Sequence, residues 1–437
     1  MNPKRRVVVI GAGVGGLTAA ALLLREGYAV TVLEAHVYPG GSAGTFFHKG
    51  YRFDAGATLA GGFGPDGPHR RIGQWLGLEW PVQAIDPAWV VRVGDEEITQ
   101  WADAERWQEE RKQKLAGSEP FWRRQEQLAD ISWRISSQNF PWPPANFKNI
   151  LDLSQAMRPW LAPAVPYLLS PMASLFPRNA SRLLRTFVDA QLLISAQTTS
   201  QHASALYGSA ALDLPRRGVN QVKGGMGGIA RTLAEWITAN GGQIHYRQAV
   251  NKVEVREGKA VGVTTEKGLA VGFDGLIANL TPWGLHKILG EASPKRLKWE
   301  VENRAHGWGA FMLYLGVKED ILGEFPGHMQ MVVDPSRPLG EGNSVFISAS
   351  GPNDTSRAPT GMRAVTVSSH TRVDEWWRLY QQDPDGYASK KADYTEKIMA
   401  AMERVIPEIR QGAQLVLPGT PVTFERFTRR PLGMVGG

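Results

Sequence analysis

The first 34 residues change their hydrophobic pattern twice. Residues 6–10 form a β-branched run of the kind that is buried in a parallel sheet. A glycine-rich turn follows at residues 11–16, and residues 17–26 are rich in Ala and Leu, which predicts a helix that Gly27 ends. Residues 28–34 predict a second strand. This βαβ order predicts a parallel sheet with a right-handed crossover.

Two stretches of the middle region predict helices of different character. Residues 101–137 are strongly charged with Trp107, Trp122 and Trp133 interleaved, which predicts two amphipathic helices broken near residues 117–120. Residues 140–177 are rich in proline and aromatic residues, and none from 159 to 177 is charged. The prolines exclude one straight membrane-spanning helix, because each interior proline removes a hydrogen bond and costs about 3 kcal/mol. Short helices at a membrane interface, the walls of an apolar tunnel and an ordinary buried helical subdomain all fit this pattern.

From residue 220 onward the pattern of the N-terminal part returns. The glycine-rich segment 224–228 predicts the start of an amphipathic helix that continues to Ala239. We expect strands at residues 243–246, 251–256, 260–265 and 273–280, with a hairpin turn at residues 257–258. Further strands are expected at residues 309–317, 344–349 and 364–369, followed by a helix at residues 389–405.

Composition excludes several classes of protein. With 437 residues, 43% apolar and 21% charged, the chain is a folded globular protein with room for two packed domains. Its net charge of +7 is thinly spread, which argues against nucleic acid and suits loose attraction to anionic lipid headgroups. No cysteine is present, so disulfides, thiolate metal sites and a flavin attached through sulfur are excluded. The nine histidines have no metal-ligand spacing, and we expect no metal.

Gly11, Gly13 and Gly16 form a G-x-G-x-x-G motif between the first strand and the first helix, the context that dinucleotide binding requires. The first glycine allows a tight turn, the second lets the backbone approach a pyrophosphate, and the third lets the helix pack on the sheet. Backbone amides and the positive end of the helix dipole then bind phosphate. Glu34 ends the second strand and is placed to accept both ribose hydroxyls, which disfavours NADP because a 2′-phosphate would be repelled.

Two segments after the second strand indicate which dinucleotide binds. Residues 39–45 read Pro-Gly-Gly-Ser-Ala-Gly-Thr, and residues 50–57 read Gly-Tyr-Arg-Phe-Asp-Ala-Gly-Ala. Together with the glycine motif they resemble the flavin amine oxidase and phytoene desaturase superfamily, and this resemblance implies FAD as the cofactor. Ser42 stands where most members have Arg, and with Ala43-Gly44 it is similar to the carotenoid isomerase-like branch that contains the C-3′,4′ desaturases.

The resemblance also implies which residues contact FAD. Gly40 and Gly41 would approach the phosphates, residues 56–58 would run past the isoalloxazine ring, and Val250 would meet the adenine end. The full expected set is Gly11, Gly13, Val14, Gly15, Gly16, Glu34, Ala35, Gly40, Gly41, Ser42, Gly56, Ala57, Thr58 and Val250. The catalytic residues stay unknown: Asp54 is expected to be structural, and His48, His202 and His306 are more often ordinary residues than catalysts.

The expected fold class is α/β, with a Rossmann-like, glutathione-reductase-like FAD-binding domain that is discontinuous. An α+β substrate domain and a helical apolar subdomain are inserted into it. We expect the FAD-binding domain at residues 1–75 and 220–300, and a substrate-binding, helical, membrane-facing domain at 76–219 and 301–425. Residues 426–437 are expected to begin a C-terminal segment that covers the flavin in family members and is truncated here.

The resemblance implies an FAD-dependent carotenoid desaturase that introduces the C-3′,4′ double bond by hydride transfer to flavin. Carotenoid cis–trans isomerisation by reduced FAD is one alternative. A non-redox lipid-binding module, such as the GDP-dissociation inhibitors of the same fold, is another, and oxidation of a water-soluble amine is a third. The expected partners are a long apolar polyene and the inner face of the membrane, to which a cytoplasmic protein would attach peripherally. Oxygen and a quinone both stay open as electron acceptor.

Overall fold

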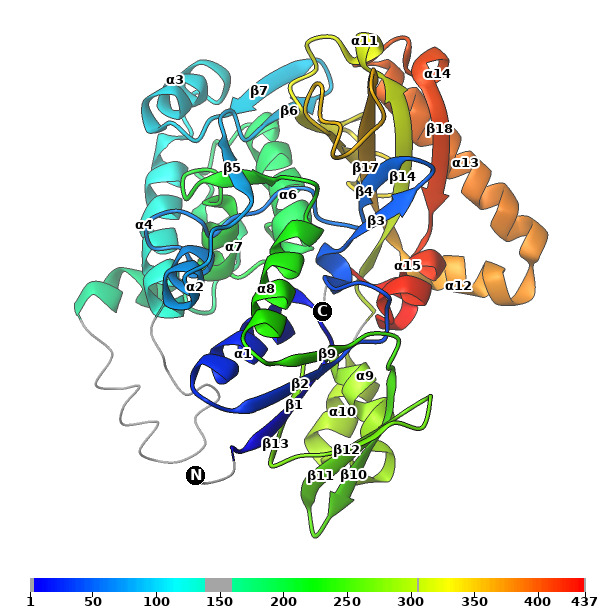
Figure 1. The fold of residues 1–437 in the computed structure, drawn as a ribbon. Helices are drawn as coiled ribbons and strands as arrows, with labels where there is room; N and C mark the ends of the chain where they lie inside the picture. The colour runs from blue at the N-terminus through cyan, green and yellow to red at the C-terminus, as the bar shows by residue number, and fades with distance from the viewer. Residues whose placement is uncertain (1–3, 138–158, 305, 436–437) are drawn as a thin grey trace.

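The computed structural model describes residues 4–137, 159–304 and 306–435. Figure 1 shows a small parallel sheet near the N-terminus, a larger sheet at the opposite end of the molecule, and a layer of helices beside them. Chain segments that are far apart in the sequence meet in each of these parts, and the expected α/β class is confirmed.

The parallel sheet has four strands in the order β13-β1-β2-β9. Its members are β1 (Arg6–Ile10), β2 (Ala29–Leu33), β9 (Gln243–His245) and β13 (Gly275–Ala278). Val7 and Val9 of β1 pack on the side of helices α1 (Val14–Arg25) and α8 (Gly227–Ala239). Val8 and Ile10 pack on the opposite side, against a small antiparallel sheet. Because both faces are covered, the strand is continuously apolar rather than alternating.

The antiparallel sheet on the second face consists of β10 (Val250–Arg256), β11 (Lys259–Thr265) and β12 (Ala270–Gly272). Glu257 and Gly258 both have positive φ, 49° and 75°, as a two-residue hairpin turn requires. Helices α9 (Pro282–Leu289) and α10 (Lys295–Asn303) follow the strand β13 on this side. The hairpin expected at residues 257–258 is therefore confirmed.

The larger sheet has seven strands in the order β18-β14-β17-β16-β15-β6-β7. They are β6 (Trp89–Val93), β7 (Glu96–Gln100), β14 (Trp308–Lys318), β15 (His328–Val332), β16 (Ser344–Ala349), β17 (Met362–Arg372) and β18 (Ala413–Gly419). All neighbours are antiparallel except β6 and β15, which are parallel. Helix α13 (Pro384–Glu403), preceded by α12 (Val373–Gln382), buries one face through Trp376, Tyr394 and Ile398.

Short elements connect the two sheets. They are the hairpin β3 (Thr45–His48) and β4 (Tyr51–Asp54), helix α2 (Pro68–Leu76), and the pair β5 (Val82–Ile85) and β8 (Val219–Val222). Helices α11 (Glu319–Leu322) and α14 (Ile409–Gly412) connect elements of the larger sheet, and α15 (Pro421–Thr428) follows β18. Phe53 and Tyr314 pack 5.5 Å apart, ring to ring, where the β3–β4 hairpin crosses the larger sheet.

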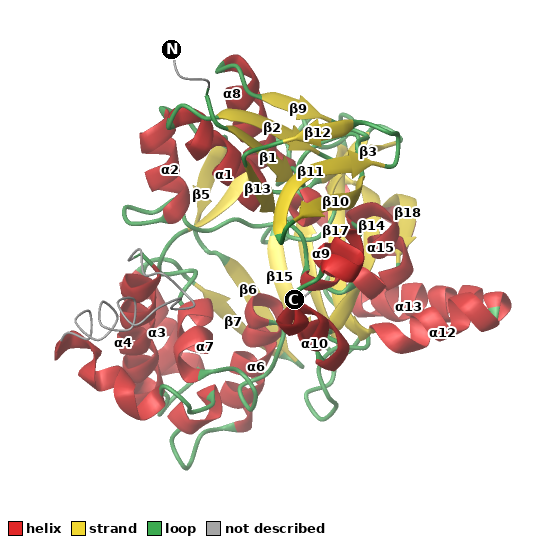
Figure 2. Ribbon diagram, turned by 90° about the horizontal axis from the view of Figure 1, so that it is seen from below, coloured by secondary structure: helices red, strands yellow, loops and turns green. Residues whose placement is uncertain are grey.

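The helical layer consists of α3 (Ala104–Lys114), α4 (Glu119–Ser136), α6 (Arg182–Ala196), α7 (Ala205–Leu212) and the 3₁₀ helices η2 (Pro159–Tyr167) and η3 (Met172–Leu175). Figure 2 shows these helices gathered beside β6 and β7. Trp107 and Trp122 meet edge to face at 5.4 Å in its core, where Phe187 joins them. The charged helices therefore bury their tryptophans within the layer.

Most predicted elements are confirmed, although some of their bounds differ. Helix α1 begins at Val14, three residues before the expected start, because the last glycines of the motif already belong to its first turn. Several elements were not predicted, among them β6, β7, β15, β18, α6, α7 and α12. Of the proline-rich segment, residues 159–177 form short helices as expected, whereas residues 140–158 lie outside the described part. Among the described helices, none combines the length and apolar character needed to cross a bilayer.

Candidate functional site

The glycine loop lies where the carboxyl ends of β1 and β2 meet the start of α1. Gly11 has φ of 93°, a conformation that L side chains rarely adopt, and its amide donates to the Leu33 carbonyl at 2.8 Å. A Cβ atom at Gly16 would lie 2.2 Å from the Gly11 carbonyl oxygen. Any side chain at Gly16 would therefore push the helix away from the sheet.

The Glu34 carboxylate lies almost fully buried at the end of β2. Oε2 accepts a hydrogen bond from the Ala12 amide at 2.6 Å, and Oε1 accepts one from the His36 amide at 2.7 Å. Each carboxylate oxygen can accept a second hydrogen bond, so the group can still take two hydroxyl donors. The side chain is thus held in place beside the glycine loop with acceptor capacity to spare.

A second glycine element faces the first. Gly40 forms a bridge with Gly13, and its amide donates to the Ala12 carbonyl at 2.8 Å. Gly40 and Gly41 have positive φ, 126° and 56°, and a Cβ atom at Gly41 would contact the Gly13 Cα at 3.7 Å. The two glycine elements therefore present bare backbone to the same space.

The structure thus brings the expected nucleotide residues together: Gly11, Gly13, Val14, Gly15, Gly16, Glu34, Ala35, Gly40 and Gly41. Val250 joins them from a distant part of the chain. It packs with Leu33 on the outer face of the parallel sheet, and Gln248 nearby donates its amide to the Glu34 carbonyl at 2.7 Å.

Asn279 is a neighbour of this loop that the sequence analysis missed. It follows β13, and its side-chain nitrogen lies 2.8 Å from the place of a Cβ atom at Gly13. The signal was available, because a polar residue directly after a buried parallel strand lies at the edge of the sheet where ligands bind.

A dinucleotide fits this arrangement. Helix α1 begins at Val14 with no acidic side chain in its first turn, so its free amides and its dipole favour an anion. The glycine loop leaves room for a pyrophosphate, and Glu34 has acceptors for ribose hydroxyls. The donors and acceptors present therefore match those that FAD requires at its AMP half.

The remaining expected residues lie at the wall of a cavity of about 430 Å³. Ser42 and residues 56–58 form one side, and Phe424, Arg430 and Met434 close it from the C-terminal part of the chain. Strands β14, β16 and β17 contribute the floor, and α6 and the end of α7 contribute the opposite wall. Such a volume suits a small ligand or a segment of a longer one.

The cavity is apolar for most of its surface, with a few polar groups placed by the large sheet. Residues 366 and 368–370 of β17 line it, and 366, 368 and 370 share one face because side chains alternate along a strand. Among the described residues, Arg430 and His370 are the ionisable groups that line this cavity, and none is a carboxylate. A permanent positive charge on a substrate would therefore meet no counter-ion here.

A buried chain of hydrogen bonds supports Thr58 from behind. Its hydroxyl lies 2.6 Å from the Ser348 hydroxyl, which lies 2.9 Å from Nδ1 of His328. Burial, with the charges of Arg357 and Arg363, lowers the pKa of His328 to about 4. His328 is therefore neutral at physiological pH, and it positions Thr58 through Ser348.

Two glutamines hold the helical wall against the sheet. Gln191 of α6 donates to the Oε1 atom of Gln330 and accepts from the indole of Trp89 at 2.7 Å. Gln330 in turn donates to the Ala190 carbonyl at 2.7 Å. Every link is buried or half-buried, so the orientation of α6 relative to the cavity is fixed.

Asp54 and the three candidate histidines lie away from the cavity wall. Asp54 is buried, where it accepts from Thr45 at 2.7 Å, from the Met226 amide at 2.7 Å and from Arg357 at 3.0 Å. These contacts join β4 to the start of α8, as a structural role requires. His48, His202 and His306 do not line the cavity, and the histidine that does, His370, was missed because nothing in the sequence reveals which face of β17 points inward.

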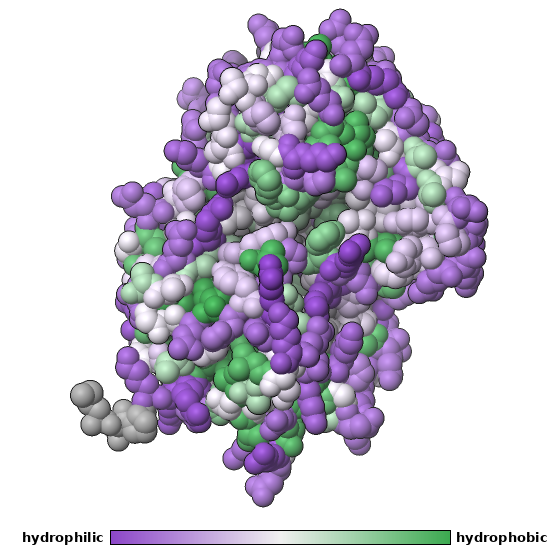
Figure 3. Space-filling view, turned by 45° about the vertical axis from the view of Figure 1, so that its right-hand side comes forward, coloured by the Kyte–Doolittle hydropathy of each residue, from purple (hydrophilic) through white to green (hydrophobic). Residues whose placement is uncertain are grey.

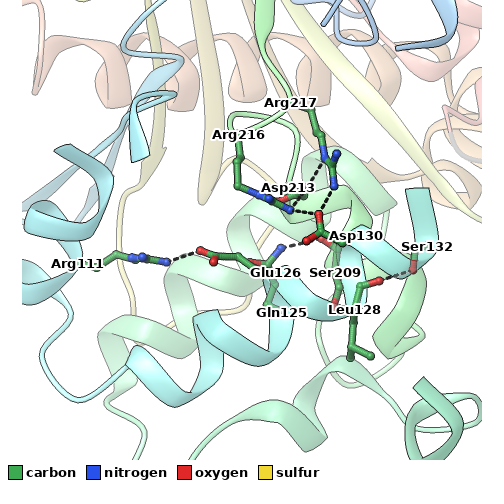
Figure 4. Close-up of polar contacts among 10 residues, drawn as sticks. All are labelled: Arg111, Gln125, Glu126, Leu128, Asp130, Ser132, Ser209, Asp213, Arg216 and Arg217. Carbon is green, nitrogen blue, oxygen red and sulfur yellow. Dashed lines mark hydrogen bonds and ion pairs between the residues drawn. The ribbon is translucent and has the colours of Figure 1, made fainter. Parts of the chain in front are cut away.

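The wall formed by α7 is anchored by charges at its C-terminal end (Figure 4). Asp213 is buried and accepts from Nε of Arg216 at 2.6 Å and from Nε of Arg217 at 2.7 Å. Both arginines also pair with Asp130 of α4. Residues 211, 212 and 214, which line the cavity, flank this buried carboxylate, so the charge cluster sets their position.

Comparison with known proteins gives a consistent picture. A family model described as flavin containing amine oxidoreductase matches residues 14–416. Prolycopene isomerase of Daucus carota is 27% identical over 451 residues, covering 98% of this chain and 71% of that protein. A 4,4'-diapophytoene desaturase of Methylomonas sp is 25% identical over 395 residues, covering 84% and 73%. The structure of cyclohexylamine oxidase from Brevibacterium oxydans matches with a TM-score of 0.60 at 15% identity, covering 100% and 87%.

Proposed function

This chain belongs to the flavin-containing amine oxidoreductase family, whose cofactor is FAD, and we propose that it modifies a carotenoid by introducing the C-3′,4′ double bond. The observation that carries this proposal is the cavity beside Ser42 and residues 56–58, which is apolar and has no carboxylate among its described lining residues. A long uncharged polyene meets such a surface without losing hydrogen bonds to water, whereas a protonated amine would lose its hydration without a counter-ion.

In this proposal the amides of the loop and of α1 would hold the pyrophosphate of FAD, Glu34 would accept its ribose hydroxyls, and Val250 would contact its adenine end. Ser42 and residues 56–58 would hold the isoalloxazine ring. The parallel sheet with residues 220–300 acts as the FAD-binding domain, and the larger sheet with the helical layer acts as the substrate domain.

The apolar side chains of the cavity position the substrate. Bound FAD supplies a two-electron hydride acceptor. Trp89, Met312 and Phe346 present apolar surface, and the Gln191–Gln330 contact keeps α6 at a fixed distance from that surface. The resulting apolar enclosure excludes water from the reacting carbons and orients a planar polyene.

A second candidate is cis–trans isomerisation of a carotenoid. The observation in its favour is that proteins named prolycopene isomerase match 98% of this chain at 27–28% identity, whereas the Methylomonas desaturase matches 84% at 25%. The same cavity and cofactor site would serve both reactions, because each needs one carbon–carbon bond of a long polyene beside the flavin: a single bond for desaturation and a double bond for isomerisation. The two differ in the mass of the product.

The deciding experiment incubates the purified chain and FAD with an acyclic or monocyclic carotenoid in lipid vesicles. Loss of two hydrogens per molecule, read by mass spectrometry, supports desaturation. An unchanged mass with a shifted absorption spectrum supports isomerisation instead. A chain that holds FAD and leaves both mass and spectrum unchanged contradicts a carotenoid substrate.

Peripheral contact with a membrane is part of the proposal. In the helical layer Val165, Leu168 and Tyr207 are exposed, and Leu169 is 100% exposed. Arg124 and Arg185 stack on aromatic rings of the same region, so cations border this apolar group. The other exposed large apolar side chains are dispersed, and on the face in Figure 3 hydrophobic residues form separate patches within a hydrophilic surface.

Helix α7 links this exposed group to the cavity. Tyr207 lies near its first turn, and residues 211 and 212 at its end line the cavity wall. An eight-residue helix is about 12 Å long, so a substrate leaving the lipid would travel a short distance beside it. A water-insoluble polyene gains from such a route because it avoids bulk water.

Replacing Leu169 with Glu tests the membrane contact. We expect co-sedimentation with anionic phosphatidylglycerol vesicles to weaken about tenfold, because one leucine loses its burial in lipid. The matched control is Val416→Glu on β18, which is also exposed but lies on the larger sheet. Equal vesicle binding by both variants and the unaltered chain would contradict this surface assignment.

A further inference from the structure

His370 occupies a distinctive place in the cavity. It lies on β17 in the same stripe as Thr366 and Ser368, and it pairs in register with Ala310 of β14. The surrounding wall is built from small and apolar residues. Among the described lining residues it is the one whose neutral form carries a basic nitrogen lone pair, because a guanidinium such as that of Arg430 has no acceptor.

Gln197 determines which ring nitrogen of His370 carries the proton. The Gln197 amide nitrogen donates to the Ile194 carbonyl at 3.0 Å, which leaves its Oε1 atom as the acceptor facing the imidazole. Nε2 of His370 lies 2.8 Å from Gln197, so this nitrogen must be the N–H donor. The other nitrogen, Nδ1, is then the unprotonated, basic atom.

The backbone at Gln197 is shaped for this contact. Gln197 ends helix α6 with φ of 58°, the left-handed conformation that non-glycine residues adopt at helix ends. Its amide is therefore set by both the helix end and the Ile194 carbonyl. Two fixed groups thus define the orientation and the tautomer of one ring.

Charged groups near His370 are engaged elsewhere. The carboxylate of Glu341 accepts from the Arg372 amide at 2.8 Å and from Thr371 at 2.9 Å, and Arg372 lies over the ring of Trp308. Burial alone lowers the pKa of His370 to about 4. The ring is therefore neutral, and able to accept a proton, at physiological pH.

We propose that His370 is the proton acceptor of the reaction, with Nδ1 as the receiving atom and Gln197 as the positioning residue. This inference rests on the proposed desaturation. With FAD bound as hydride acceptor, one C–H bond of the substrate would break with its electron pair leaving as hydride, and the C–H bond on the adjacent carbon would break with its proton going to Nδ1. The electron pair of the second bond becomes the new C=C bond, and the imidazolium later releases its proton to water.

A weak base suffices for this step. A proton on a carbon next to a developing allylic cation is strongly acidic, so an acceptor with a low pKa can still remove it. General-base catalysis contributes about 10²–10⁴-fold in enzymes where the base is well placed. The low pKa also keeps the ring unprotonated and ready in an apolar enclosure.

His370→Gln is the first test, because glutamine can still donate to Gln197 but has no basic nitrogen. In single-turnover reduction of the FAD-loaded protein by carotenoid, we expect the rate to fall at least about 100-fold. Bound FAD per chain and the substrate KM should stay within twofold of the unaltered protein. The matched control is His202→Gln, an exposed histidine that does not line the cavity.

Gln197→Glu tests the positioning role through the pH profile. A carboxylate still accepts from Nε2 and raises the pKa of His370, so the low-pH limb of kcat should move to higher pH while the rate near neutrality is kept. Gln197→Leu, which removes the acceptor, should lower kcat about tenfold with little change in KM. An unchanged low-pH limb in Gln197→Glu would overturn the positioning role.

The outcomes separate this inference from the proposed function. If the unaltered protein removes two hydrogens and His370→Gln keeps its rate within threefold, desaturation stands and His370 is not the base. If the unaltered protein does not remove two hydrogens, both fall. Should His370→Gln fail to hold FAD, His370→Gly with added imidazole decides: a restored rate supports the inference, and an FAD-loaded variant without restoration overturns it.

Discussion

The glycine-loop end of the parallel sheet and the apolar cavity are built by opposite means. At the glycine loop, bare backbone from residues 11–16 and 40–41 shapes the surface, and Glu34 adds the principal side-chain acceptor. In the cavity, side chains from the β17 stripe, α6, α7 and the C-terminal part of the chain meet. The first region is specified by short segments of sequence, and the second by tertiary packing. Substitutions in the two regions should therefore affect different properties of the protein.

The largest expected effect is at Gly16. In Gly16→Ala the new Cβ atom meets the Gly11 carbonyl at 2.2 Å, so the start of α1 must shift and the phosphate-facing amides move with it. We expect affinity for FAD, measured by fluorescence quenching, to fall more than about 100-fold. The control is Gly275→Ala on β13, where the nearest atom, in Val7, lies at 3.7 Å. Equal FAD affinity in both variants would contradict a sterically closed loop.

Replacing Asp213 should have the opposite effect, which is a loss of stability without a loss of FAD affinity. Asp213→Ala leaves the exposed Asp130 as the carboxylate that Arg216 and Arg217 share among the described residues, so the anchor of α7 is lost. We expect the free energy of unfolding to fall by about 3 kcal/mol in a urea titration of the chain. Affinity for FAD at the distant glycine loop should be nearly unchanged in the folded protein. A loss of FAD affinity as large as that in Gly16→Ala would show that the two regions are not independent.

Lowering the pH should reduce the free energy of unfolding through His328, which lies behind the cavity wall. Its pKa is about 4 when folded and 6.5 when unfolded, so the unfolded chain binds the extra proton between these values. The stabilising contribution is complete above pH 6.5 and is lost as pH falls towards 4. Between pH 7 and pH 5 we expect a loss of about 2 kcal/mol from this residue. In His328→Asn the same pH change should cost correspondingly less, and an identical loss would contradict the assignment.

The contrast also explains what sequence could reveal. The glycine motif, Glu34 and the hairpin at Glu257 follow from local sterics and hydrogen bonding, and the structure places them as those rules require. His370 and Gln330 have no such local signature. Their importance depends on which face of a strand turns inward, and that is decided by pairings between distant segments.

Strand β15, which was not predicted, shows the same limit. All five of its residues are buried, and it reads His-Met-Gln-Met-Val, with little β-branched character. Its strand conformation is imposed by β16 on one side and β6 on the other. Tertiary pairing here overrides weak local preference.

The parallel pairing of β6 with β15 also affects the order in which parts of the nascent chain can fold. Val90 pairs with Met329, which is synthesised roughly 240 residues later. Strand β1 pairs with β13, which is also synthesised much later than β1. By contrast, the described core of the helical layer lies mainly between Trp107 and Ala205. On the ribosome the helical layer can therefore close first, while β1 and β6, which already have β2 and β7 as neighbours, each keep one edge unpaired. Those strands are the part of the nascent chain that most needs a chaperone.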